Sequence, residues 1–159
     1  MQERRVTIRP KPFRSFRGRT YVDAVSPESA PIVARLGLGV LIIPQKPWEM
    51  TVKELGAYRA HYREYNGCDA PPPIVASFVA CHTGRSPPTS PATASIASCL
   101  QLYGTPEQVY ERIREYQRLA GSDTVIGIFS YGGMPHDDTR RNMKLFAERV
   151  LARLKADAS

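Results

Sequence analysis

The sequence predicts an α/β fold with a parallel sheet, because short apolar runs alternate with helical patterns. Residues 40–43 are a continuous apolar run, as expected for a parallel strand that is covered on both faces, and residues 74–81 are apolar except for Ser77. The segments between such runs carry apolar residues every three or four positions, which is typical of one buried helix face. Four strands, each paired with a helix, fit either an open four-stranded sheet or part of a (β/α)8 barrel.

The first unit, residues 20–45, has the pattern of strand, turn, helix and strand. Residues 20–25 suit a pleated surface. Ser26 stands where a helix N-cap is expected, with Pro27 at the first helical position. This turn would point helix N–H groups at the carboxyl end of a strand, where the hydroxyls of Ser26 and Ser29 add further donors. It is therefore either a helix cap alone or a site for an anion.

A second helix is expected over residues 48–65, and Asn66-Gly67 is expected to end it. Its apolar stripe consists of Trp48, Val52, Leu55, Tyr62 and Tyr65. We interpret the tyrosines as packing residues. A stiff proline connector, residues 71–73, then leads into a third strand over residues 74–81.

Residues 84–101 break this alternation. The segment is rich in Pro, Ser, Thr and Ala, carries one charge, and follows neither the helical nor the strand period. We therefore expect a flexible linker that interrupts the domain, with regular structure resuming at Thr105.

A third helix is predicted to begin with a capping box. Thr105 and Gln108 have the required spacing, with Pro106 at the first helical position and Gly121 at the end. The predicted buried stripe consists of Val109, Ile113, Tyr116 and Ala120.

The C-terminal part should contain a fourth buried strand over residues 124–130 and a turn at residues 131–133. Asp137 or Asp138 is expected to cap the last helix. The predicted core face of that helix consists of Met143, Ala147, Val150 and Leu154.

Composition favours a single globular domain. The chain has 159 residues, and no apolar run approaches the ~18 residues that a membrane helix needs. Cys68, Cys81 and Cys99 are odd in number and widely spaced, so they predict neither a disulfide framework nor a zinc site. With no apolar leader visible, a cytoplasmic location and no membrane partner are the default expectations.

Residues 1–19 form a basic arm ahead of a domain over residues 20–159. The arm holds seven Lys or Arg and one Glu, against a net charge of +7 for the whole chain. Phe13 and Phe16 lie between the arginines and could stack on bases. A solvated connecting segment is the preferred interpretation over a nucleic-acid site, because no nucleic-acid-binding motif accompanies the arm.

Several segments, in this order, resemble the luciferase-like flavin-dependent monooxygenases. They are SPESA followed by ARLGLG, a strand and PQKP, and later GTPEQVYERIREYQ and FSYGGMPHDDTRRNMKLFAERVL. The resemblance covers about residues 20–83 and 102–154. It implies a partial (β/α)8 TIM barrel, namely the second half with about four βα units.

The same resemblance implies a cofactor and a reaction class. Family members use a reduced flavin, usually FMN, which a flavin reductase can supply, while some relatives use the deazaflavin F420. The flavin activates O2 to oxidise a small organic substrate. By resemblance, Ser26 and Ser29 lie in the loop that binds the flavin phosphate, and Gly132 and Gly133 allow close approach of the backbone to the flavin. No catalytic residue is assigned, and a structural role is preferred for His82.

The chain departs from the family in two respects. Residues 84–101 stand where the family carries a longer, partly helical cover over the active site. The first four strands, with the histidine and arginines that serve the flavin, have no counterpart. We therefore expect a shortened form whose two open sheet edges lead to self-association or to pairing with a complementary half-barrel. The alternative function is a non-catalytic remnant or an interaction protein derived from that family.

Overall fold

A computed structural model describes residues 9–11, 13–16, 18–23, 26–83 and 100–157. In chain order the elements are β1 (Tyr21–Val22), α1 (Ala30–Arg35), β2 (Gly39–Ile42), α2 (Trp48–Asn66), β3 (Ile74–Cys81), β4 (Leu102–Gly104), α3 (Pro106–Ala120), β5 (Thr124–Ile128), α4 (His136–Leu145), the π-helical segment η3 (Phe146–Leu151) and α5 (Ala152–Ala156). None of the helices in these ranges is long and apolar enough to cross a membrane.

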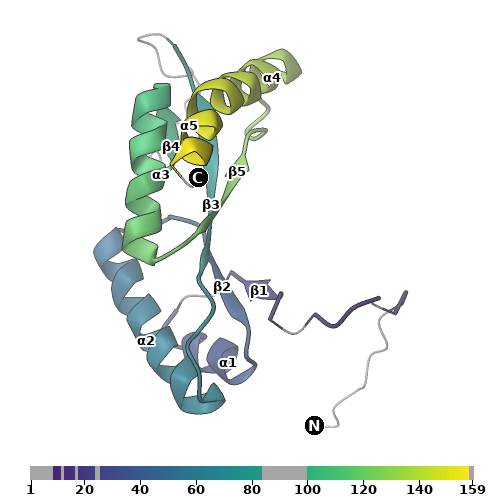
Figure 1. Ribbon diagram of the computed structural model, residues 1–159, viewed down its shortest axis with the longest axis vertical. Coiled ribbons are helices and arrows are strands. Elements are labelled where there is room, and N and C mark those ends of the chain that lie inside the picture. Colours follow the sequence, from purple (N-terminus) through teal and green to yellow (C-terminus); the bar gives the residue numbers. More distant parts are fainter. Residues whose placement is uncertain (1–8, 12, 17, 24–25, 84–99, 158–159) are drawn as a thin grey trace.

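The strands form one parallel sheet with β3 at its centre (Figure 1). β1 pairs with β2, and β2 pairs with the first residues of β3. β5 pairs with residues 74–78 of β3, and β4 pairs with residues 79–81. The predicted mainly parallel α/β sheet is therefore confirmed. The predicted number of strands is wrong, because the sequence does not reveal the short strand β4, which follows the predicted linker.

The side chain of Gln101 joins β2, β3 and β4. Its Oε1 accepts hydrogen bonds from Ser77 Oγ and from the Phe78 backbone N–H, both at 2.8 Å. Its Nε2 donates to the Pro44 carbonyl at 2.6 Å. β2 and β4 lie one after the other along the same edge of β3, and this amide spans the gap between them.

The linker predicted over residues 84–101 is thus wrong at its C-terminal end. Gln101 is only 3% exposed and Leu102 is fully buried. A single polar residue beside a three-residue strand gives no periodic signal, so the sequence does not reveal that this end belongs to the sheet. The remainder of the predicted linker, residues 84–99, lies outside the described residues.

Asn142 of α4 plays the matching part on the opposite edge of β3. Its Oδ1 accepts from the Cys81 N–H at 2.8 Å, and its Nδ2 donates to the Val79 carbonyl at 2.6 Å. β5 ends at Ile128, opposite Phe78. The amide therefore satisfies backbone groups of β3 beyond the point where β5 stops.

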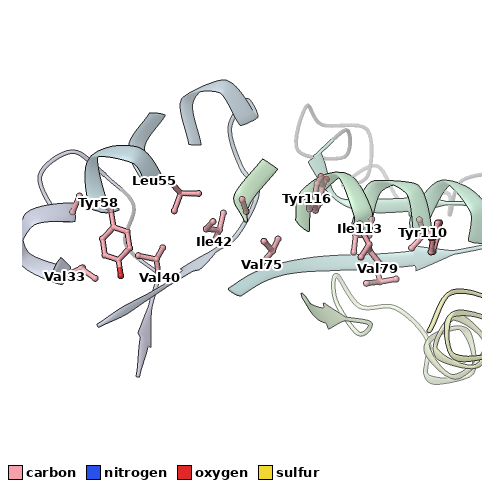
Figure 2. Packing of buried hydrophobic residues seen from close by; sticks show 14 of the residues in the cluster. Val33, Val40, Ile42, Leu55, Tyr58, Val75, Val79, Tyr110, Ile113 and Tyr116 are labelled. Atoms are coloured by element: carbon pink, nitrogen blue, oxygen red, sulfur yellow. The ribbon is translucent and has the colours of Figure 1, made fainter. Parts of the chain in front are cut away.

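The hydrophobic core lies between the helices and one face of the sheet. Val40 and Ile42 of β2 and Val75 and Val79 of β3 are all buried in it. Figure 2 shows the helices that carry Leu55, Tyr58, Ile113 and Tyr116 on the same side of these strands. Alternate residues of a strand point to opposite faces, so the odd-numbered residues of β3 and β5 face the helices and the even-numbered residues face away.

β5 is not the buried strand that the sequence predicts over residues 124–130. It spans Thr124–Ile128, Thr124 is exposed, and Ile126 is 42% exposed. Val125 packs against the core. A continuous apolar run is expected where both faces are covered, and here the described helices cover only one.

The boundaries of α2 and α3 follow the predictions closely. Gly67 and Gly121 end these helices in the left-handed conformation, and Thr105 forms the predicted capping box with Gln108. The whole predicted stripe of α3 is buried. The predicted stripe of α2 is partly wrong: Val52 and Tyr65 are exposed, and the fully buried positions are Thr51, Leu55, Tyr58 and Tyr62.

The last helical region departs most from its prediction. Pro135, and neither Asp137 nor Asp138, occupies the N-cap position of α4. Met143 and Ala147 are exposed, while Val150 is fully buried. The π-helical segment η3 contains more residues per turn than an α-helix. The buried positions of this region therefore do not follow the period of 3.6 residues on which the prediction is based.

Candidate functional site

The candidate site lies at the end of the sheet where the carboxyl ends of the parallel strands meet. All pairings are parallel, so the carboxyl ends of the strands share one edge. Polar or flexible residues follow three of the strands there: Ser26–Ser29 after β1, His82 after β3, and Gly132-Gly133 after β5. Ligands of α/β proteins bind preferentially at this edge.

Ser26 and Ser29 form a closed pair. The Ser26 N–H donates to Ser29 Oγ at 3.0 Å, and the Ser29 N–H donates to Ser26 Oγ at 3.3 Å. The two hydroxyl oxygens are 3.1 Å apart, and Ser29 Oγ also donates to the Ser26 carbonyl. The structure therefore brings together the two serines that the sequence singles out.

The predicted start of the first helix at Ser26 and Pro27 is too early. α1 begins at Ala30, with Ser29 at its N-cap position. Ala30 N–H still bonds to the Ser26 carbonyl at 3.0 Å. Pro31 has no N–H to donate to the carbonyl four residues before it, so the regular series of helical hydrogen bonds starts late.

A carboxylate of the chain itself lies at this turn. The backbone N–H of Glu28 and the Ser26 hydroxyl hold the pKa of the Glu28 carboxyl below its ordinary value. The donors of the turn therefore favour negative charge. Because Glu28 is fully exposed, an external anion could displace its carboxylate.

A polar hollow of about 290 Å³ opens beside the ends of β1 and β2. It is lined by Asp23, Ile42, Ile43, Gln45, Lys46 and Thr51. Lys46 forms an ion pair with Glu54 of α2, so the hollow already holds one neutralised cation at its wall. A ligand with a negative group could contact both Lys46 and the serine turn only if the side chains of Glu28 and Glu54 moved away.

A group of aromatic side chains, Phe78, Tyr103 and Tyr131, lies near the carboxyl ends of the strands, on the face that points away from the helices. The Tyr131 ring lies 5.0 Å from Phe78 and 6.1 Å from Tyr103, centroid to centroid, and is stacked on the latter. Tyr103 pairs with Ala80, so Phe78, Ala80 and Tyr103 share that face. Sequence reasoning missed this group, because Tyr103 lies in the strand that the sequence did not reveal.

Two buried polar atoms in this region lack a hydrogen-bond partner among the described residues. They are the Tyr131 hydroxyl and His82 Nδ1. Burial raises the pKa of Tyr131, and the nearby Tyr103 hydroxyl raises it further. Tyr131 therefore stays protonated over the physiological range and can donate a hydrogen bond to a bound molecule.

Gly132 and Gly133 form the predicted turn after β5. Their φ angles are +59° and +75°, and the Met134 N–H closes the turn on the Tyr131 carbonyl. A side chain at either position would meet no atom within 4 Å, so the space beside the turn is open. The conformation requires glycine, and the open space permits a close approach by a ligand.

The two predicted pairs lie at opposite edges of the sheet. β1 carries the serine turn, β5 carries the glycine turn, and β2 and β3 lie between them. Neighbouring strands are about 4.8 Å apart, so roughly 14 Å separates the two strands. Within one chain, the serine pair and the glycine pair are therefore not neighbours.

Two other regions are less suited to a site. A larger hollow of about 620 Å³, lined mainly by apolar groups of α2, α3 and Leu100, lies on the helical side of the sheet. In the basic arm, Phe13 is 97% exposed and Phe16 is 59% exposed. Among the described residues no cluster of His, Cys, Asp and Glu could hold a metal ion.

No family model matches the sequence, and a comparison with curated proteins finds no match either. Solved structures do match. The monooxygenase RslO1 from Streptomyces bottropensis is 24% identical, with a TM-score of 0.61 over 82% of this chain and 46% of that one. Flavoprotein 390 is 15% identical, with a TM-score of 0.63 over 89% of this chain and 70% of that one.

A third match carries a bound cofactor. It is the oxygenating constituent of 3,6-diketocamphane monooxygenase from the CAM plasmid of Pseudomonas putida, a type II Baeyer-Villiger monooxygenase in complex with FMN. It is 12% identical, with a TM-score of 0.56 over 82% of this chain and 46% of that one. The chain thus spans about half the length of two of these proteins. The likeness is one of fold, and that fold is found in monooxygenases and in flavoproteins.

Proposed function

We propose that this chain is the second half of a (β/α)8 barrel of the luciferase-like type and serves a flavin-dependent monooxygenase reaction. The order β1-β2-β3-β5 of parallel strands, with the described helices on one face, carries this proposal. The match of 82% of the chain to a protein in complex with FMN supports it. The expected cofactor is FMN in its reduced form, delivered by a reductase, with F420 as the alternative.

The residues at the carboxyl edge fit parts of a flavin. The serine turn offers backbone and hydroxyl donors that already attract a carboxylate, and a phosphate would replace Glu28 there. The aromatic group with its unpartnered Tyr131 hydroxyl offers a flat apolar surface and one donor for a ring system. Gly132 and Gly133 leave room for the ring to approach the backbone.

Bound reduced flavin would supply the oxygen chemistry, while the protein contributes position and water exclusion. Phe78 and Tyr131 would hold the reacting ring against the face away from the helices. The protonated Tyr131 hydroxyl would donate to an oxygen or nitrogen of the ring or of a small organic substrate. A single chain leaves that face open to water, so we expect binding by the isolated chain to be weak and turnover to be absent.

The open face also favours a second candidate, a non-catalytic interaction protein with the same fold. This candidate predicts an assembly without flavin affinity. The two candidates separate in one binding measurement, because only the first requires FMN to bind.

The test is titration of the chain with FMN, followed by flavin fluorescence. Ser26→Ala should weaken binding about ten- to a hundred-fold, the loss expected for one hydrogen bond to a charged group. Thr124→Val is the matched control, since it removes a hydroxyl at the amino end of β5, far from the carboxyl ends of the strands where the serine turn lies. Equal affinities of Ser26→Ala and the unaltered chain would refute the phosphate assignment. No binding at millimolar FMN would favour the interaction protein.

A further inference from the structure

The sheet face that points away from the helices is apolar, and no described helix packs on it. It presents Leu41, Ile74, Phe78, Ile126 and Ile128, none of which belongs to the core cluster of the described residues. Ile126 is 42% exposed and the other four are half-buried, while the smaller Ala76 and Ala80 between them are buried. The strand register places them side by side: Leu41 pairs with Ile74, and Phe78 with Ile128. We call these five residues the open face. No charged residue interrupts the paired positions of the three strands.

Both outer edges of the sheet are also open. Among the described strands, β1 pairs only with β2, and β5 only with β3. Each edge therefore presents unpaired backbone N–H and C=O groups, which favour pairing with another strand. An apolar face and two open edges together call for a partner that brings strands of its own.

We infer that the partner is a second copy of this chain, related by a twofold axis that runs parallel to the strands. Such an axis keeps all strands parallel and places β5 of each copy beside β1 of the other. Four principal strands from each copy then make eight, the number of the (β/α)8 barrel. The two open faces come together as the barrel interior, and no edge remains. Two copies also provide about the length of two of the matched proteins, of each of which one chain covers 46%.

This arrangement completes the candidate site. In one chain the serine turn and the glycine turn lie at opposite edges of the sheet. In the assembly β5 neighbours β1 of the second copy, so Gly132-Gly133 of one copy lies beside Ser26–Ser29 of the other at each junction. The flavin site of the proposed function would then be shared between copies, although the assembly itself does not depend on flavin.

The assembly is tested by sedimentation velocity from about 1 to 100 μM protein, without flavin. The unaltered chain should sediment as a dimer at the upper concentrations. Ile126→Lys should weaken the dimer about a hundred-fold, because it places a charge among the apolar side chains of the open face. Ile32→Lys is the matched control: Ile32 is 54% exposed on α1, away from the open face, and this variant should remain dimeric. Circular dichroism should show that both variants are folded.

Hydrogen exchange distinguishes barrel closure from other dimers. The N–H groups of β1 and β5 should exchange more slowly at 100 μM than at 1 μM, because the edges pair with each other. A monomer at 100 μM, a dimer that survives Ile126→Lys, or edge strands that exchange equally fast at both concentrations would overturn the inference. A dimer that fails to bind FMN would refute the proposed function and leave the assembly standing.

Discussion

The two faces of β3 differ in what covers them, although their sequences are almost equally apolar. On the helical face, Val75 and Val79 are fully buried against α2 and α3. On the opposite face, the small side chains of Ala76 and Ala80 are 5% exposed, whereas the larger Ile126 of the neighbouring strand β5 is 42% exposed. Among the described residues, the larger apolar side chains of these strands are therefore fully covered on one face only. The difference teaches that hydrophobic periodicity reports where burial is required, while the partner that provides the burial can lie outside the chain.

The ends of β3 show the same contrast at the level of hydrogen bonds. Where neighbouring strands stop short, Gln101 on one edge and Asn142 on the other complete the pairing with side-chain amides. The outer edges at β1 and β5 receive no such completion among the described residues. Within the chain, the sheet is closed around β3 and open at its margins.

The largest expected loss of stability follows from a substitution on the face of the sheet that the helices cover. Ile113 is 1% exposed at the centre of the α3 stripe. Ile113→Ala should lower the free energy of unfolding by about 2–5 kcal/mol, because it leaves a cavity in a packed core. Urea denaturation at 1 μM protein measures it. A loss well under 1 kcal/mol would mean that the helical face is as loosely packed as the open one.

Asn142→Ala should lower the free energy of unfolding by a comparable amount. It leaves the Cys81 N–H and the Val79 carbonyl without partners in a buried setting, at about 1–3 kcal/mol for each group. Amide exchange at Cys81 should accelerate in parallel. Arg140→Ala, an exposed change on the same helix, serves as the control and should leave both quantities nearly unchanged. Loss of stability without faster exchange at Cys81 would contradict the bridging role.

The ionisation of the Cys81 thiol reports whether the end of β3 is buried. Burial, and then the nearby Glu107, raise the pKa of the Cys81 thiol from 9.0 to about 11. At pH 8 its thiolate fraction should be about a hundred-fold below that of an unperturbed thiol, and its labelling correspondingly slow. Because the folded pKa is the higher one, stability should fall as pH rises from about 9 to about 11. The measurements are thiol-labelling kinetics at pH 8 and urea denaturation across that range, in a Cys68→Ser, Cys99→Ser background. Rapid labelling at pH 8 would show that the end of the strand is open.

The parts of the fold that sequence predicts well are those with local causes. The capping box of Thr105, the glycine at position 121 and the stripe between them lie within a few residues of one another, and α3 has the predicted bounds. The bonds of Gln101 depend on where β2 stops and β4 begins, which no local pattern encodes. The register of the last helix depends on the π-helical turns of η3, which shift Met143 and Ala147 outward.

The candidate site divides in the same way. Ser26, Ser29, Gly132 and Gly133 follow strands, so their place at the carboxyl edge is predictable from the alternation of elements. That the two pairs lie at opposite edges follows from the strand order, which is a property of the whole sheet. The aromatic group required Tyr103 to be recognised as part of a strand. Glu28 stands in the SPES segment, but its occupation of the serine turn becomes visible only with the backbone in place.

The smallest expected effect is on the open face, and it depends on concentration. Ile126→Ala removes the same atoms as Ile113→Ala, but from a side chain that solvent already reaches. At 1 μM, where the chain should be monomeric, it should change the free energy of unfolding by less than about 0.5 kcal/mol. At 100 μM the unaltered chain should become more stable by mass action, since only the folded state forms the dimer, and Ile126→Ala should gain less. Urea denaturation of both proteins at the two concentrations measures the four values. If the cost of Ile126→Ala is the same at both concentrations, the open face stays exposed in solution. If its cost already equals that of Ile113→Ala at 1 μM, the chain itself covers the face, and the contrast between the two faces disappears.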